Sequence, residues 1–162
     1  MKTNPRFVID TNVLLVSISS KSQYHWIFQG LINLEFELVI TTKILSEYEE
    51  IISDKYSTTV AQNVIRTLLL FPNVIQSNVY YNWNLIQNDR DDDKFVDCAI
   101  ASNADAIITH DKHFNILKNI PYNNRPSGPS PRRCDGGWKR SRQKPGFIEL
   151  IPASNGQKPL PG

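Results

Sequence analysis

The sequence predicts one α/β domain built on a parallel β-sheet. Short apolar runs at residues 7–9, 37–41 and 105–109 have the composition of buried strands, and segments with a helical spacing of apolar residues separate them. Runs that are apolar throughout are typical of strands covered on both faces, as in parallel sheets. The alternation of strands and helices therefore predicts an α/β fold with a parallel sheet.

Each element is set by its apolar spacing and by the residues at its ends. Thr42 suits the N-cap of the helix after the second strand, and Pro72 ends a later helix because proline cannot continue one. The run Asp91, Asp92 and Asp93 favours a helix start, since free N–H groups and the macrodipole attract negative charge there. In chain order the predicted elements are a strand at 7–9, a helix at 24–34, a strand at 37–41, helices at 42–53 and 58–71, a strand at 73–76, a helix at 93–103 and a strand at 105–109.

The composition changes sharply after residue 122. Residues 1–122 hold 10 Lys/Arg against 14 Asp/Glu, whereas residues 123–162 hold 8 against 2. Six of the seven glycines and seven of the ten prolines also lie in residues 123–162. We expect a folded domain at 1–122 and a basic, Pro/Gly-rich tail at 123–162 that is disordered or atypical, because it can bury little apolar surface. The one strand-like piece of the tail is GFIELI at residues 146–151.

The composition also indicates which cellular compartment to expect. No apolar run approaches the roughly 18 residues of a membrane-spanning helix, and the first residues lack the apolar stretch of a secretory signal. Two cysteines are too few to indicate a disulfide framework. We therefore expect a reducing, cytoplasmic setting and no membrane association.

Four acidic side chains are predicted to meet at one edge of the sheet. Asp10 follows the first strand and Asp111 follows the strand at 105–109, and ligands bind beyond the carboxyl ends of parallel strands. Asp93 begins the helix before that strand, and Glu47 lies on the helix after the second strand. Two unit charges about 4 Å apart repel by about 4 kcal/mol at an effective dielectric constant of about 20, so such a group needs a cation or protons. Mg²⁺ or Mn²⁺, which prefer oxygen ligands, would suit it and would support phosphodiester hydrolysis.

The remaining aspartates of this region have different interpretations. Asp91 and Asp92 are interpreted as solvated charges at the helix start. Asp97 lies one turn after Asp93 on the same helix face. The sequence is equally consistent with Asp97 as a surface residue and as a second metal ligand.

The sequence gives little support for histidine metal sites, a cysteine nucleophile, nucleotide-binding loops or other hydrolase motifs. His110 and His113 flank Asp111 without a metal-binding spacing such as HExxH, so we assign them surface or substrate-side roles. Cys98 is interpreted as a small core residue. The chain contains no GxGxxG, GxxxxGK[ST] or GxSxG motif, and its DTNVL lacks the second aspartate of the DxDxT motif of phosphoaspartate enzymes.

The motifs and their order resemble the PIN domain family. They are VIDTNVLL at residues 8–15, an acidic residue within LSEYEEII at 45–52, and DDDKFVDCAIASNADAIITHDKHF at 91–114. The resemblance covers roughly residues 5–122, and the last motif is the most specific in combination. Within the family the chain looks most like the toxin ribonucleases of prokaryotic toxin–antitoxin systems.

The resemblance implies a three-layer α/β/α fold with a central parallel sheet of about four or five strands. It also implies Mg²⁺- or Mn²⁺-dependent cleavage of single-stranded RNA. By matching motif positions, Asp10, Asp93 and Asp111 would be the principal metal ligands, and Glu47 would complete the site or orient the attacking water. Asp97 falls where this branch of the family often has an additional acid.

The resemblance further implies supporting residues and partners. Asn12 and Thr109 match polar residues that position the acids or a metal-bound water. Lys94 and Lys112 are local cations that would offset the repulsion between the acids and RNA phosphates. Members of this branch are usually homodimers, silenced by a cognate antitoxin with a segment that enters the active-site groove.

The C-terminal part departs from the family pattern. After NIPY at residues 119–122, the chain lacks the short strand and apolar helix with which the family usually ends. Loss of an edge strand would expose backbone groups and apolar surface. Two alternatives to a ribonuclease therefore remain open: an inactive PIN-like module that binds nucleic acid or protein, and the product of a gene with a disrupted C-terminus.

Overall fold

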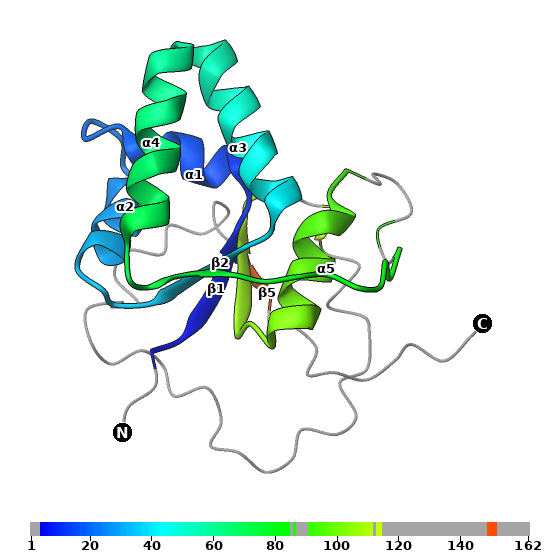
Figure 1. The fold of residues 1–162 in the computed structure, drawn as a ribbon. Helices are drawn as coiled ribbons and strands as arrows, with labels where there is room; N and C mark the ends of the chain where they lie inside the picture. The colour runs from blue at the N-terminus through cyan, green and yellow to red at the C-terminus, as the bar shows by residue number, and fades with distance from the viewer. Residues whose placement is uncertain (1–3, 85, 87–90, 112, 115–148, 152–162) are drawn as a thin grey trace.

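A computed structural model describes residues 4–84, 86, 91–111, 113–114 and 149–151. It contains one sheet with helices packed against it (Figure 1). The strands are β1 (Arg6–Ile9), β2 (Glu37–Ile40), β3 (Val74–Gln76), β4 (Ala106–Thr109) and β5 (Glu149–Ile151). The helices are α1 (Thr11–Ile18), α2 (His25–Ile32), α3 (Thr42–Lys55), α4 (Thr58–Leu70) and α5 (Asp93–Ser102).

The sheet has the strand order β3-β2-β1-β4-β5. The first four strands are parallel, and β5 pairs with β4 in the antiparallel direction. The predicted α/β/α fold with a central parallel sheet is confirmed. From β1 the chain adds β2 and β3 on one side and later returns to add β4 on the other side of β1. The strand order therefore switches between β1 and β4, and open α/β sheets bind ligands at such a switch point.

Helices cover the two faces of this sheet. The crossovers from β1 to β2 and from β2 to β3 run toward one edge, and the crossover from β3 to β4 runs back past β1. Since parallel crossovers are right-handed, α5 lies on the face opposite to α1–α4 (Figure 1). Helices α3 and α4 form a hairpin that extends beyond the sheet.

Helix α1 was not predicted from the sequence. It begins directly after β1, where the Asp10 side chain caps it by accepting a hydrogen bond from the backbone N–H of Asn12. Val13, Leu14 and Leu15 are all buried, so the helix lacks the alternation of polar and apolar faces that marks a surface helix. The other helices lie within a few residues of their predicted bounds.

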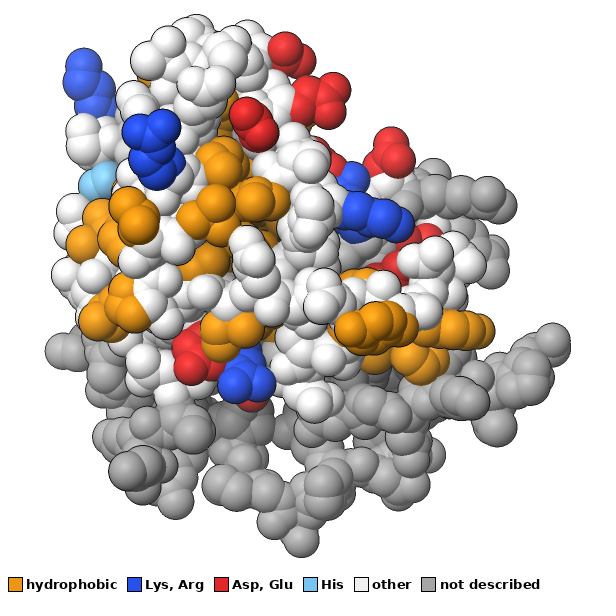
Figure 2. Space-filling model, viewed as in Figure 1, with side chains coloured by type: hydrophobic (Ala, Val, Ile, Leu, Met, Phe, Trp, Pro, Cys, Tyr) orange, Lys and Arg blue, Asp and Glu red, His pale blue; other side chains and the backbone are white. Residues whose placement is uncertain are grey.

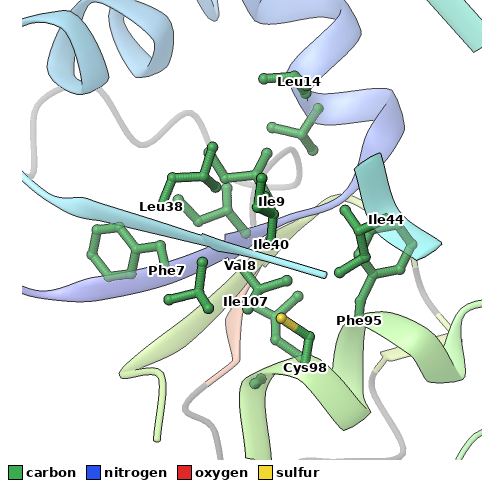
Figure 3. Close-up of a cluster of buried hydrophobic side chains, with 14 of the residues drawn as sticks. Phe7, Val8, Ile9, Leu14, Leu38, Ile40, Ile44, Phe95, Cys98 and Ile107 are labelled. Carbon is green, nitrogen blue, oxygen red and sulfur yellow. The ribbon is translucent and has the colours of Figure 1, made fainter. Parts of the chain in front are cut away.

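The core lies between the sheet and α1, α3 and α5 (Figure 3). Cys98 of α5 points into it beside Ile107 of β4, as expected for a core cysteine. Burial, assisted by the nearby Asp97, raises the pKa of the Cys98 thiol to about 12, so the thiol stays protonated and inert.

One part of the C-terminal tail belongs to the sheet. Residues 149–151 pair with β4, with Glu149 opposite Thr109 and Ile151 opposite Ile107. The end of the GFIELI segment thus pairs with the edge of β4, which was expected to be exposed because the usual last strand of the family is missing. The predicted disorder of the rest of residues 123–162 concerns residues outside the described part of the chain. Among the helices described, none has the length and apolar character needed to cross a membrane.

Candidate active site

Asp10 and Asp111 are joined through one buried threonine at the carboxyl edge of the sheet. Asp10 continues the β1–β4 pairing, because its backbone N–H donates to the Ile108 carbonyl at 3.0 Å. The Thr109 hydroxyl donates to Asp10 Oδ2 at 2.9 Å and accepts the backbone N–H of Asp111 at 3.0 Å. Thr109 therefore orients both the first and the last acid of the predicted set.

Asp10 is a buried carboxylate, with only 4% of its surface exposed. Burial raises the pKa of this carboxyl above its ordinary value, and the negative charge of Asp111 acts in the same direction. Hydrogen bonds from Thr109 and from the Asn12 backbone, together with His110, oppose this increase without cancelling it. A cation at this position would favour the ionised form of Asp10.

Glu47 connects α3 to the two other elements of the site. Its Oε1 accepts a hydrogen bond from the Thr11 hydroxyl at 2.5 Å, directly beside Asp10. Its Oε2 forms an ion pair with Lys94 of α5, directly beside Asp93. Glu47 thus links the neighbourhood of Asp10 to that of Asp93.

Asp93 and Asp97 are buried on α5 and hold the segment before this helix. Asp93 Oδ1 accepts the Ile86 backbone N–H at 2.7 Å, and Asp97 Oδ1 accepts the Trp83 backbone N–H at 2.8 Å. Asp97 is 4% exposed, which rules out the surface interpretation. Burial and the neighbouring Asp93 raise the pKa of Asp97, although the bond from Trp83 and the charge of Lys43 oppose the increase.

The second carboxylate oxygen of Asp93 lacks a hydrogen-bond donor among the described residues. Asp93 Oδ2 is buried and accepts no hydrogen bond from the described residues. A buried carboxylate oxygen without a donor is costly, and a bound cation would satisfy it. The donor set of the site, which consists of carboxylate oxygens, fits Mg²⁺ or Mn²⁺.

A second group of candidate metal ligands contains one predicted acid and two residues assigned other roles. Asp92, Asp111 and His113 each place one ligand atom within 4.8 Å of the others. His113 Nδ1 lies 3.4 Å from Asp111 Oδ1 and 3.6 Å from Asp92 Oδ2. Asp92 is the N-cap residue of α5, but its side chain makes no capping hydrogen bond, unlike the solvated helix-start charge that was expected. The dense run of aspartates and the DKH sequence were the only signals for this group.

The remaining predicted residues differ in their contacts. Lys94 is held by Glu47. Asn12 contacts Asp10 through its backbone N–H, while its side chain is exposed. Asp91 is exposed, as expected for a solvated charge at the helix start. Lys112 lies outside the described residues.

A polar groove of about 1230 Å³ adjoins these residues. Glu47, Asp93 and Asp97 line it, together with Lys43, Lys94 and the segment that leads from β3 toward α5. Asp10 and Asp111 are absent from its lining among the described residues, and they connect to it through Thr11 and Glu47. The predicted acids therefore form two adjacent sets, one at the strand ends and one in the groove.

Comparisons with known proteins agree with this architecture. A family profile described as PIN domain matches residues 6–113. The fold is also similar to a chain in the crystal structure of VapBC2 from Rickettsia felis bound to a DNA fragment from their promoter. That match has a TM-score of 0.51 and 16% sequence identity, and covers 68% of this chain and 91% of the other. No curated protein matches the sequence.

Proposed function

Because the chain belongs to the PIN domain family, we propose that it is a metal-dependent endoribonuclease that cleaves single-stranded RNA. The observation that carries this proposal is the buried Asp93 Oδ2, which lacks a donor among the described residues in a site otherwise rich in carboxylates. In a protein that binds no cation there, this buried oxygen would lower the stability of the fold without a compensating contact.

Asp10, Asp93 and Asp111 would hold Mg²⁺ or Mn²⁺, with Glu47 and Asp97 nearby. When bound, such an ion lowers the pKa of water and stabilises the charge that develops on the phosphodiester. Thr109 fixes the orientation of Asp10 and Asp111 through its hydroxyl. Lys94 balances the charge of Glu47, which reduces the repulsion of an incoming phosphate.

Cleavage of a labelled single-stranded RNA tests this function directly. We expect cleavage with Mg²⁺ or Mn²⁺ and none in excess EDTA. Mutation of a residue that only supports a metal ligand typically lowers metal affinity or activity by about 10- to 100-fold. Because Asp10 and Asp93 would be ligands themselves, Asp10→Asn and Asp93→Asn should each reduce the cleavage rate by at least about 100-fold. Glu49→Gln is the matched control, because Glu49 lies exposed on α3 and does not line the groove. Cleavage that persists in EDTA would contradict the metal mechanism.

The second candidate function is an inactive binding module. The observation in its favour is that the acids already have partners within the protein: Asp93 and Asp97 each hold a backbone N–H, and Glu47 holds Lys94. This alternative predicts RNA binding that is sensitive to salt and is lost when residues 123–162 are deleted, with no cleavage under any metal.

We further propose that the protein is the toxin of a toxin–antitoxin pair. The similar solved structure is described as VapBC2 bound to promoter DNA, and the groove beside the acids would accommodate a segment of the antitoxin. A small protein encoded by the neighbouring gene should then inhibit RNA cleavage at a stoichiometry near 1:1. Full cleavage in its presence would contradict the pairing.

A further inference from the structure

The segment of residues 77–84, SNVYYNWN, is held in place at both ends. At its start, the Ser77 N–H donates to the Ile40 carbonyl at the end of β2 at 2.8 Å. Toward its end, the Trp83 N–H donates to the buried carboxylate of Asp97. The segment has no helix or strand of its own, yet its position is fixed by the sheet and by α5.

This fixed segment displays two tyrosine side chains to solvent. Tyr80 is 92% exposed and Tyr81 is 61% exposed. The Tyr81 ring also packs edge-on against Trp83, with ring centroids 4.9 Å apart and an interplanar angle of 70°. Figure 2 shows a group of hydrophobic side chains over this part of the chain, below a set of charged side chains. Neighbouring exposed aromatic rings on a fixed backbone are a feature of binding surfaces.

The segment forms one side of the polar groove at the acidic site. Tyr80, Asn78 and Asn82 line the groove from this segment, and Lys43 and Lys94 line it from α3 and α5. At about 1230 Å³ the groove exceeds the roughly 300–1000 Å³ of small-molecule pockets, which indicates an extended ligand.

The chemistry of these side chains matches one class of extended ligand. Aromatic rings stack on unpaired bases, and amides form hydrogen bonds with base edges. Ammonium groups attract phosphates. A duplex keeps its bases stacked on one another, so only a single strand can use exposed rings in this way.

We propose that residues 77–84 form a base-stacking ledge on which Tyr80, and next to it Tyr81, hold unpaired bases of a single-stranded RNA as it enters the groove. The inference rests on the proposed ribonuclease function and assigns the substrate-binding residues of that site. It also gives Asp97 a role as a positioning residue, because its carboxylate holds the backbone of the ledge.

Binding can be measured apart from cleavage. The variants Tyr80→Ala, Tyr80→Trp and Tyr56→Ala are made in an Asp10→Asn background with Mg²⁺, which keeps the RNA intact. Fluorescence anisotropy then gives Kd for a 12-nucleotide unstructured RNA and for a perfect RNA duplex. Tyr56, 53% exposed at the end of α3 and away from the groove, is the matched control.

Since one base stack is worth about 5- to 100-fold in Kd, Tyr80→Ala should weaken single-strand binding by that factor. Tyr80→Trp and Tyr56→Ala should stay within about 2-fold of the parent.

Several outcomes would overturn the ledge. These are an unchanged Kd for Tyr80→Ala, an equal loss of duplex binding, or no binding of single-stranded RNA by the parent. A change of oligomeric mass on Tyr80→Ala, with RNA affinity unchanged, would instead make the tyrosines a protein interface. Cleavage by the protein with Asp10 intact is measured in a separate assay. RNA cleavage with an unchanged Kd for Tyr80→Ala would overturn the ledge alone, whereas loss of the ribonuclease proposal requires that no cleavage occurs with Mg²⁺ or Mn²⁺.

Discussion

Asp93 and Asp97 each give one carboxylate oxygen to the backbone that precedes α5. Both side chains are almost fully buried, and each accepts a hydrogen bond shorter than 3 Å from that backbone. The same acids also line the groove. The charge of the groove and the position of the segment beside it are therefore coupled through two residues on one helix face.

Replacing Asp97 with asparagine should stabilise the metal-free protein at neutral pH. The folded-state pKa of Asp97 is raised, so the ionised form is disfavoured by folding, and this penalty is present in full above the folded-state pKa. An asparagine side chain at this position would carry no charge and could still accept the Trp83 N–H. The gain in Tm should shrink as pH falls through the folded-state pKa and should vanish below the ordinary Asp value of 3.8, where Asp97 is protonated in both states.

Thermal unfolding in EDTA between about pH 4 and 8 measures this difference. Asp54→Asn, at an exposed position on α3, should show no such pH dependence. A loss of stability at pH 7, or a gain that is constant with pH, would contradict the assigned cause.

The sequence identified the residues whose position depends on strand ends. Asp10 and Asp111 follow from the rule that parallel strands share a carboxyl edge, whereas Thr109 was expected from the family resemblance, and the hydrogen bonds of Thr109 join the two acids. The proximity of Asp92 to His113 depends on the path of the chain after β4, which no periodicity encodes. The burial of Asp97 likewise depends on the segment at Trp83 folding over it.

At the scale of elements, regular amphipathic helices were predictable and α1 was not. Helices α3 and α4 have distinct polar and apolar faces, and their bounds were predicted to within about two residues, although the N-cap of α3 is Thr41 and not the predicted Thr42. Helix α1 is short and buried on several sides, so its sequence gives no helical periodicity. The pairing of β5 with β4 joins residues about 40 positions apart, and only the folded sheet shows it.

Removal of β5 should weaken the sheet edge. A chain ending at residue 148 loses the pairing with β5 along Ile107, Ile108 and Thr109, which opens one edge of β4 while its pairing with β1 remains. With a net value of about 1 kcal/mol per hydrogen bond, the loss in unfolding free energy should be about 1–3 kcal/mol, and the open edge should promote aggregation. A chain ending at residue 152 keeps β5 and is the matched control. Urea unfolding and light scattering measure both effects, and equal behaviour of the two chains would show that β5 does not stabilise the fold.

At the scale of the whole molecule, a group of exposed aliphatic side chains lies at the end of the sheet opposite to the acids. Segments before β2 and β3 expose Ile32 and Leu34 at 45% each, Leu69 at 46% and Leu70 at 76%. Asn73 brings these segments together, because its amide donates to the carbonyls of Leu31 and Phe36 at 3.0 and 2.7 Å. Figure 2 shows hydrophobic side chains gathered over α2 and α4. A homodimer formed through this surface would leave the carboxyl edge of the sheet open to RNA.

Substitution of Leu70 tests the homodimer that the family resemblance predicts, and it should separate the two copies without harming the fold. Leu70→Arg places a charge in the apolar surface, where a partner would have to desolvate it, while the free chain loses little because Leu70 is already exposed. Sedimentation equilibrium should give twice the chain mass of 18.5 kDa for the unmodified protein and a single chain mass for Leu70→Arg. Tyr56→Arg, at an exposed position at the far end of the α3–α4 hairpin, should remain a dimer. A monomeric unmodified protein, or a Leu70→Arg variant that stays dimeric, would show that this surface does not join two copies.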